Sequence, residues 1–352
     1  MRLLFFIFSL TNSAGTERIS TSLANALSTN GWQVDFVVND SDTRHFFSLN
    51  SNINVYSLGL DKNVVKHKIK AASRLHRLIR RERYDIILNV GVACACITFL
   101  AFPWMCGCKI FSWEHFSMKN TGPMGKLKRC ISAFLSNHTI VLTHADLKAY
   151  PRLLQKKMSV IPNFTNINKD SYIATLDSNT VLAAGRIEGK IKGFDLLVKA
   201  WKEVTTYYPN WNLRIVGGGN PQELKQIIKE QKLEKSVTLT GPIENMEAEY
   251  LNSSVFVLSS RSEPFGLVLI EAMSFGVPVV SFDCPNGPHE IVNDGVDGKL
   301  VENGNVKALA TAVMEMIADK DTRKRMGKAA FQKYSDKYIL DKILLMWLSV
   351  LN

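Results

Sequence analysis

The sequence of 352 residues has no low-complexity segment and no internal repeat, which excludes a disordered linker protein and a repeat scaffold. Acidic residues are scarce in its first half: residues 1–165 hold 21 Lys and Arg against 9 Asp and Glu, whereas residues 166–352 hold 22 against 23. The formal net charge of +11 therefore lies in the first half, at +12 against −1. No interleaved aromatic residues or recognition-helix pattern accompany this charge, so nucleic acid is not an expected partner.

A cluster of acidic residues of the kind that holds a divalent metal is also missing, so neither a metal nor another cofactor is expected. Six cysteines are present, five of them between residues 94 and 130. The pairs Cys94/Cys96 and Cys106/Cys108 are compatible with zinc, but we interpret them as core residues, because their surroundings are mostly apolar and buried Cys behaves as a small hydrophobe. Reduced thiols in turn favour a cytoplasmic protein.

Two apolar segments have the composition of a signal peptide or a membrane span. Residues 1–10 form a short run that leads into a glycine-containing turn and an amphipathic helix, so we interpret the run as a first β-strand. Residues 86–108 carry no charge over 23 positions, which is a membrane-spanning length. Polar residues and a proline dilute that segment, and we predict a buried strand followed by a helix.

The chain exceeds the roughly 250–300 residues at which single cores stop growing, so two domains are expected. Strand and helix patterns alternate, which indicates an α/β fold with parallel sheets. We predict two Rossmann-like, doubly wound domains that face a cleft, at residues 1–165 and 166–335, with an Asn- and Asp-rich linker at 166–179. The predicted strands are 3–8, 33–38, 54–58, 85–90, 109–113 and 139–142 in the first domain, and 181–184, 211–216, 236–240, 255–258 and 279–282 in the second.

Residues 328–352 contain neither proline nor glycine and predict one or two helices. The apolar end of this segment, from about residue 336 to 352, packs either on the first domain or within the second. In the first half of the chain, a basic helix is predicted at residues 66–83, which hold eight basic side chains and one acid. Its face is either solvated or meets anionic lipid head groups or a diphosphate-linked acceptor. The apolar residues at helical spacing are Val65, Ile69, Ala72, Leu75 and Ile79.

Two carboxylates, Glu263 and Glu271, lie eight positions apart around a loop that contains Pro264 and Gly266. A buried strand at 255–258 precedes them, and helix formers from Leu267 to Ser274 follow. The amides of Phe265, Gly266 and Leu267 would then be exposed at a helix start. On either side of them, the two carboxylates could accept hydrogen bonds from ligand hydroxyls. Alone, such a pair is also compatible with a loop residue and an ordinary solvated helix residue.

The surrounding residues, 259–280, resemble the E-x7-E region of retaining glycosyltransferases of family 4, which have the GT-B fold. The resemblance spans nearly the whole chain and is most specific from residue 181 to about 300. It implies a GT-B fold whose C-terminal helix crosses back to the first domain. It also implies that Glu263 contacts the donor sugar, that Glu271 holds the ribose, and that the amides of Phe265 to Leu267 meet the diphosphate.

Residues 185–197 resemble the family's G-R-x-x-x-x-K-G block, whose Arg and Lys bind the donor diphosphate. This implies the same role for Arg186 and Lys192. The spacer here is one residue longer, so Lys190 stays an alternative. Gly217 to Gly219 either approach the nucleotide or form a tight turn.

In the first domain, the turn at residues 13–18 resembles the family's G-G-x-E-R turn. Ala14 replaces its first glycine, so that only Gly15 carries over as a diphosphate contact. His115 ends an apolar strand and resembles the family histidine beside the donor sugar, which implies a catalytic role; otherwise it is a structural hydrogen bonder. Whether Glu114 takes part stays open.

The resemblance implies a retaining, metal-independent hexosyltransferase that uses a nucleotide sugar. Residues 281–291 resemble the corresponding block of family members that use UDP-sugars, which favours UDP over GDP. The basic first half favours a saccharide or polyprenyl-diphosphate-linked acceptor in bacterial surface-polysaccharide (lipopolysaccharide-type) synthesis, at the inner face of the plasma membrane. Two alternatives are a nucleotide-sugar epimerase of the same fold and a non-enzymatic basic membrane-binding protein.

Overall fold

A computed structural model describes residues 1–60, 65–119, 121–165 and 172–352. The chain divides into two compact units. Unit 1 contains Met1–Asn163 together with Ile343–Asn352, and unit 2 contains Phe164–Lys342. Part of the predicted linker, residues 166–171, lies outside the described residues.

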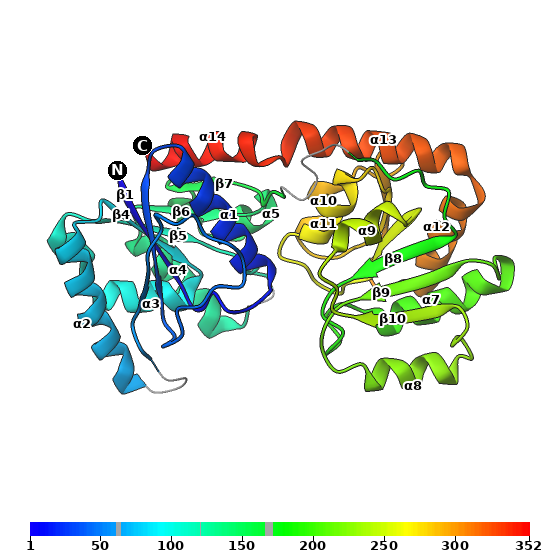
Figure 1. Cartoon of the computed structure of the whole chain (residues 1–352), viewed down its shortest axis with the longest axis horizontal. Helices are drawn as coiled ribbons and strands as arrows, with labels where there is room; N and C mark the ends of the chain where they lie inside the picture. The colour runs from blue at the N-terminus through cyan, green and yellow to red at the C-terminus, as the bar shows by residue number, and fades with distance from the viewer. Residues whose placement is uncertain (61–64, 120, 166–171) are drawn as a thin grey trace. The chain divides into compact units, whose positions relative to one another are not determined.

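Unit 1 is built on a seven-stranded parallel sheet with the strand order β3-β2-β1-β4-β5-β6-β7. Figure 1 labels β1 and the strands β4 to β7 of this sheet. Helices follow most strands, because a parallel connection must cross back over the sheet. The strands are β1 (Arg2–Ile7), β2 (Gln33–Val38), β3 (Val55–Ser57), β4 (Ile86–Val90), β5 (Lys109–Trp113), β6 (His138–Val141) and β7 (Met158–Val160). The helices are α1 (Gly15–Thr29), α2 (Val65–Glu82), α3 (Val92–Leu100), the 3-10 turn η1 (Pro103–Cys106), α4 (Pro123–Leu135), α5 (His144–Lys148) and α6 (Arg152–Gln155).

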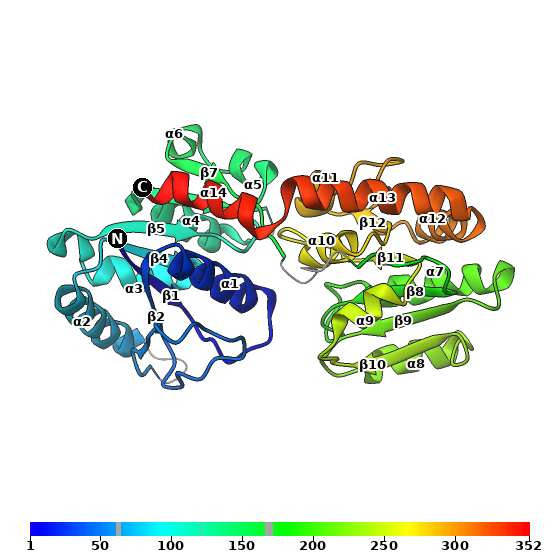
Figure 2. The same ribbon diagram turned by 45° about the horizontal axis from the view of Figure 1, so that its top comes forward.

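Unit 2 is built on a six-stranded parallel sheet with the order β10-β9-β8-β11-β12-β13. Its strands are β8 (Thr180–Ala184), β9 (Asn212–Val216), β10 (Val237–Gly241), β11 (Val255–Leu258), β12 (Val279–Asp283) and β13 (Gly298–Glu302). Its helices, which Figure 2 shows from a second direction, are α7 (Phe194–Tyr207), α8 (Gln222–Glu230), α9 (Met246–Leu251), α10 (Leu267–Ser274), α11 (Gly287–Ile291), α12 (Val306–Ala318) and α13 (Lys320–Lys337).

Helices cover both faces of the second sheet, as strand β11 illustrates. Its Val255 and Val257 are buried in one core cluster with residues of α7 and α12. The residue between them, Phe256, points to the other face, where its ring lies 5.9 Å from the ring of Tyr250 in α9. A strand buried on both faces has no polar side, which explains why residues 255–258 are a continuous apolar run.

The chain ends in α14 (Leu340–Leu351), and its last ten residues belong to unit 1. The buried ring of Trp347 meets that of Trp113, at the end of β5, in an edge-on contact with 4.7 Å between the centroids. This confirms the prediction that the terminal helix returns to the first half of the chain.

The predicted strands are all present, with bounds that agree within two residues. Residues 86–108 form β4, α3 and η1, and no helix in the described part of the chain is long and apolar enough to cross a membrane. Two edge strands, β7 and β13, were not predicted; β13 carries two charges, which interrupt its apolar pattern. Of the apolar residues at helical spacing in α2, Ala72, Leu75 and Ile79 are buried, together with Ala71 and Leu78, whereas Ile69 is 71% exposed. The side chain of Val65 lies outside the described residues.

Candidate functional site

The predicted site residues of unit 2 lie at the carboxyl ends of two neighbouring strands. Chain order reverses between β8 and β11, since β8 continues outward to β9 and β11 to β12. The loops that follow such strands leave the sheet in opposite directions and open a crevice for ligands. The loop after β8 carries Arg186 and Lys192, and the loop after β11 carries Glu263.

Lys192 and Glu263 form an ion pair across this crevice. The Nζ atom of Lys192 lies 2.6 Å from Oε1 of Glu263, and the hydroxyl of Ser260 donates to the same oxygen at 2.6 Å. The Glu263 side chain is 8% exposed and that of Lys192 is 24% exposed. The pair therefore holds one negative and one positive group at the open end of the sheet.

The backbone beside Lys192 is fixed on the end of β11. Gly193 has a φ of +63°, and a Cβ atom there would lie 1.9 Å from the carbonyl oxygen of Ser259. The hydroxyl of Ser259 donates to the carbonyl of Lys192 at 2.9 Å. Only glycine permits so close an approach, which brings the lysine within reach of Glu263.

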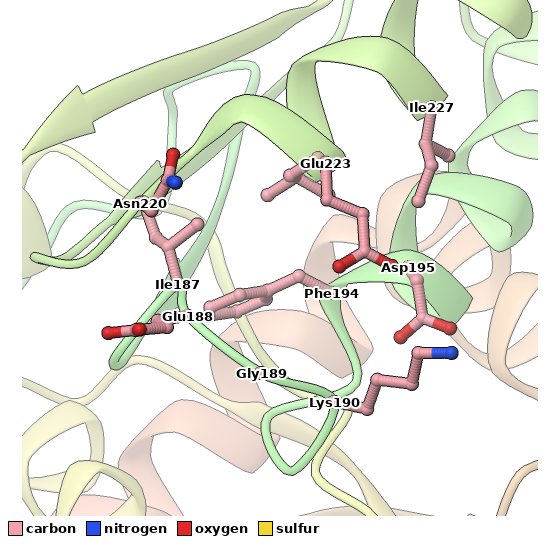
Figure 3. A pocket seen from close by; sticks show the side chains of 10 residues that line it. Ile187, Glu188, Gly189, Lys190, Phe194, Asp195, Asn220, Glu223 and Ile227 are labelled. Carbon is pink, nitrogen blue, oxygen red and sulfur yellow. The ribbon is translucent and has the colours of Figure 1, made fainter.

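Lys190 has different surroundings. It lines a pocket of about 160 Å³ together with Glu188, Asp195 and Glu223, and Figure 3 shows the side chains of these residues. Arg261 donates to both carboxylate oxygens of Asp195, at 2.8 and 2.7 Å, and these bonds lower the pKa of Asp195. Lys190 therefore lies beside several carboxylates, whereas Lys192 is paired with the carboxylate of Glu263.

Arg186 is exposed and has no hydrogen bond or ion pair with the residues that the structure describes. Its guanidinium is therefore available to a ligand. The neighbouring glycine turn has a structural explanation, because a Cβ at Gly217 would lie 1.7 Å from the carbonyl oxygen of Gly185. Gly217 thus lets β9 approach the arginine loop, and Ile187 donates to the Gly218 carbonyl at 2.8 Å.

Glu271 lies in α10 and is 2% exposed, so it is not a solvated helix residue. The buried hydroxyl of Tyr250, from α9, donates to its Oε2 at 2.8 Å. A buried carboxylate is stable only when hydrogen-bonded, and this bond also fixes its orientation. Tyr250 itself stacks on Phe275, with centroids 5.4 Å apart and planes at 12°.

The start of α10 lies between the two carboxylates. The helix runs from Leu267 to Ser274, as predicted, and Gly266 is its N-cap. The amides of Phe265, Gly266 and Leu267 donate to no acceptor among the described residues. Free amides at a helix start attract anions.

In unit 1, Gly15 is the first residue of α1. Ala14, the N-cap, has an ordinary extended backbone (φ −88°, ψ 166°), and its side chain makes no capping hydrogen bond. An alanine adopts this conformation without strain, so the substitution of the family's glycine costs nothing in backbone freedom here.

His115 follows β5 and is 6% exposed. Its ring lies 4.3 Å from that of Trp113, and its buried Nε2 atom has no hydrogen-bond partner among the described residues. Burial lowers the pKa of His115 to about 3, so the imidazole is neutral near pH 7. A neutral imidazole can donate or accept a hydrogen bond but brings no positive charge.

Buried charges hold the loop that carries His115. Arg129 of α4 pairs with Glu114 and donates to the Phe116 carbonyl at 2.8 Å. Asp146 accepts the amide of Met118 at 2.7 Å. Burial, opposed by Arg129, raises the pKa of Glu114 to about 7. Glu114 is therefore part of the buried network that holds the loop.

Comparison with known proteins gives a family for each half of the chain. Residues 13–169 match the model described as Glycosyltransferase Family 4, and residues 165–333 match Glycosyl transferases group 1. An uncharacterized glycosyltransferase of Haemophilus influenzae is 30% identical over 99% of both chains. The chain belongs to glycosyltransferase family 4.

Two further similarities cover the whole glycosyltransferase. The amylovoran biosynthesis glycosyltransferase AmsD of Erwinia amylovora is 28% identical, over 100% of this chain and 99% of its own. The crystal structure of Anabaena Alr3699/HepE in complex with UDP and glucose has a TM-score of 0.82 at 18% identity, over 100% of this chain and 99% of that one. The fold is GT-B, as predicted.

Some contacts in the glycosyltransferase site were not predicted from the sequence. Tyr250 and Ser260 hold the two glutamates, but a Tyr in a short helix and a Ser after a strand are too common to single out. Asn286 pairs with Glu263 through a backbone bridge and lies in the segment, 281–291, that favoured UDP. Within the described residues, no group of three His, Cys, Asp or Glu side chains has metal-binding geometry, and the six cysteines are unbridged.

Proposed function

We propose that this glycosyltransferase moves a hexose or N-acetylhexosamine from a UDP-sugar to a saccharide or a polyprenyl-diphosphate-linked acceptor, with retention of the anomeric configuration and without a metal. Unit 2 binds the donor and unit 1 binds the acceptor. The products are bacterial surface polysaccharides, made at the inner face of the plasma membrane.

The observation that carries the proposal is the group of donors at the β8 and β11 strand ends. Lys192 and the free amides of Phe265 to Leu267 surround Glu263, and the unpaired Arg186 lies on the same loop as Lys192. A diphosphate needs such a set, because Arg presents a fork of donors, Lys a point charge and the helix start a partial positive charge. Glu263 and Glu271 offer acceptors to hydroxyls of the sugar and the ribose.

The proposed step breaks the bond between the anomeric carbon and the β-phosphate oxygen and forms a bond from that carbon to the acceptor oxygen. The leaving oxygen gains negative charge, which Arg186, Lys192 and the amides stabilise. The acceptor proton passes to that leaving oxygen. Gly15 contributes an amide to the diphosphate, and His115, being neutral, accepts or donates a hydrogen bond at the donor sugar.

The names of the similar proteins agree with this donor and product class. HepE was crystallised with UDP and glucose, and AmsD is named for the synthesis of amylovoran. The charge distribution supports an anionic acceptor, since residues 1–165 carry a net +12.

The test is a screen of UDP- and GDP-sugars for release of the nucleoside diphosphate, with and without saccharide and lipid-linked acceptors. We expect UDP release that depends on an acceptor. Formation of an isomerised sugar nucleotide without any acceptor would identify an epimerase and overturn the proposal. Absence of turnover with every donor and acceptor would also overturn it and favour the non-enzymatic binding protein.

A further inference from the structure

Helix α4 of unit 1 exposes an apolar stripe to solvent. The stripe residues, all 44–65% exposed, are Met124, Leu127, Ile131, Phe134 and Leu135. They recur at steps of three, four, three and one, which places them on one side of the helix. The residues that α4 buries, Arg129, Ser132 and Ala133, are on the opposite side. The α4 stripe therefore reverses the usual pattern, in which the apolar side of a surface helix faces the core.

Basic side chains accompany the stripe. Lys126 and Lys128 are exposed on α4, and α4 contains no acidic residue. Helix α6 packs against α4 and carries Leu153, which is 71% exposed, next to the exposed Arg152. An apolar stripe with lysines at its sides is typical of a helix that lies in the interface of a bilayer.

The net charge of unit 1 favours an anionic bilayer, rather than a second copy of the chain, as the partner of the α4 stripe. Unit 1 carries 21 basic and 9 acidic residues, a net +12, because its C-terminal segment, residues 343–352, has no charge. A symmetric contact would bring two such surfaces together and cost electrostatic energy, whereas an anionic bilayer attracts them.

Helix α2, the basic helix predicted from the sequence, has a different surface. Among its described side chains, Ile69 is the only large apolar residue with an exposure of this size. Its exposed positions, which include Lys70, Arg77 and Arg80, provide charge without apolar area to insert. Long-range attraction is therefore expected from α2, and insertion from α4.

We propose that the α4 stripe inserts into the interface of a bilayer that contains anionic lipid. This rests on the proposed function, in which the acceptor is lipid-linked. The buried side of α4 holds the His115 loop through Arg129, whose guanidinium binds Glu114 and the Phe116 carbonyl. Phe116 is 62% exposed, next to His115. Insertion of α4 would thus place this loop at the membrane surface, where a lipid-linked acceptor lies.

The test is flotation of the full chain with vesicles of phosphatidylcholine alone or with about one third phosphatidylglycerol. The variant Leu127→Ser/Phe134→Ser shortens the stripe, and Ile69→Ser/Val296→Ser removes two exposed apolar residues elsewhere (71% and 51%). In the proposed bound state both side chains are buried in the bilayer, so their loss should weaken partitioning into anionic vesicles about tenfold or more. The control variant should bind anionic vesicles within about twofold of the wild type, a difference too small to indicate a lost contact.

Thermal unfolding midpoints and turnover with a water-soluble acceptor should match the wild type in both variants, which separates a failure of this proposal from a failure of the proposed function. Equal partitioning of the α4 variant and the wild type would overturn the proposal. So would a wild-type dimer that the α4 variant converts to a monomer, because that result assigns the stripe to a second copy.

Discussion

The ammonium of Lys192 lies 2.6 Å from Oε1 of Glu263, and the two residues are 71 positions apart in the chain. Their strands, β8 and β11, are hydrogen-bonded neighbours, so the loops after them meet at one edge of the sheet. In the proposed reaction, an ion pair at this place would orient the carboxylate for sugar hydroxyls and keep a cation beside the departing diphosphate.

The first prediction separates two lysines of one loop. Lys192→Ala should lower kcat/KM for the nucleotide sugar by about 10²–10³, because it removes a charged donor at the leaving group. Lys190→Ala should change kcat/KM by less than about threefold, since Lys190 faces carboxylates instead. Steady-state rates of both variants, with unfolding midpoints as a check on folding, decide the question. A larger loss in Lys190→Ala would assign the diphosphate to Lys190.

The second prediction concerns the hydrogen bond from Tyr250 to Glu271. Tyr250→Phe should raise KM for the donor about 10- to 150-fold, which corresponds to the roughly 1.5–3 kcal/mol of one hydrogen bond to a charged group. The matched control is Tyr334→Phe, whose buried hydroxyl donates to the Thr165 carbonyl at 3.1 Å. That variant should lose stability without a change in KM. An equal KM in both variants would mean that Tyr250 only supports the core.

The third prediction tests the role of the glycine turn. Gly217→Ala should destabilise unit 2 by about 2–5 kcal/mol, because its Cβ would meet the Gly185 carbonyl and its φ of +155° suits glycine. Gly218→Ala should cost far less, since a Cβ there has no neighbour within 4 Å. Urea unfolding of both variants measures this difference. Equal stability would show that the two strand ends separate easily.

The fourth prediction is a pH dependence of stability from His115. Its pKa is about 3 in the folded chain and near 6.5 when exposed, so the unfolded chain binds more protons between these values. The stabilisation by neutral His115 is therefore complete above pH 6.5 and is lost as the pH falls towards 3. The free energy of unfolding should drop by about 2 kcal/mol between pH 7.5 and pH 5 from this residue.

The control for this pH effect is His115→Gln, which cannot titrate. The difference between wild type and variant in urea unfolding isolates the contribution of His115, since the other groups titrate in both proteins. Parallel pH curves for the two proteins would contradict a buried, neutral His115.

Sequence patterns predicted the two-sheet fold and the secondary-structure positions of the unit 2 site, because apolar strands, glycine turns and helix formers are local signals. Glu263 and α10 lie where the pattern places them. The partners of these residues were not predictable: Tyr250 reaches Glu271 from another helix, and Arg129 reaches Glu114 from α4, through contacts that depend on packing. The same applies to α4, whose apolar residues predict a helix but not which side faces the core.

Titration of UDP into the protein, followed by calorimetry, tests the central claim that the loops after β8 and β11 hold a nucleoside diphosphate. Arg186→Ala should weaken UDP binding about 10- to 100-fold, the effect of one or two charge-assisted hydrogen bonds, whereas Lys190→Ala should bind like the wild type. Absence of UDP binding in the wild type, or equal affinity in Arg186→Ala, would contradict the account.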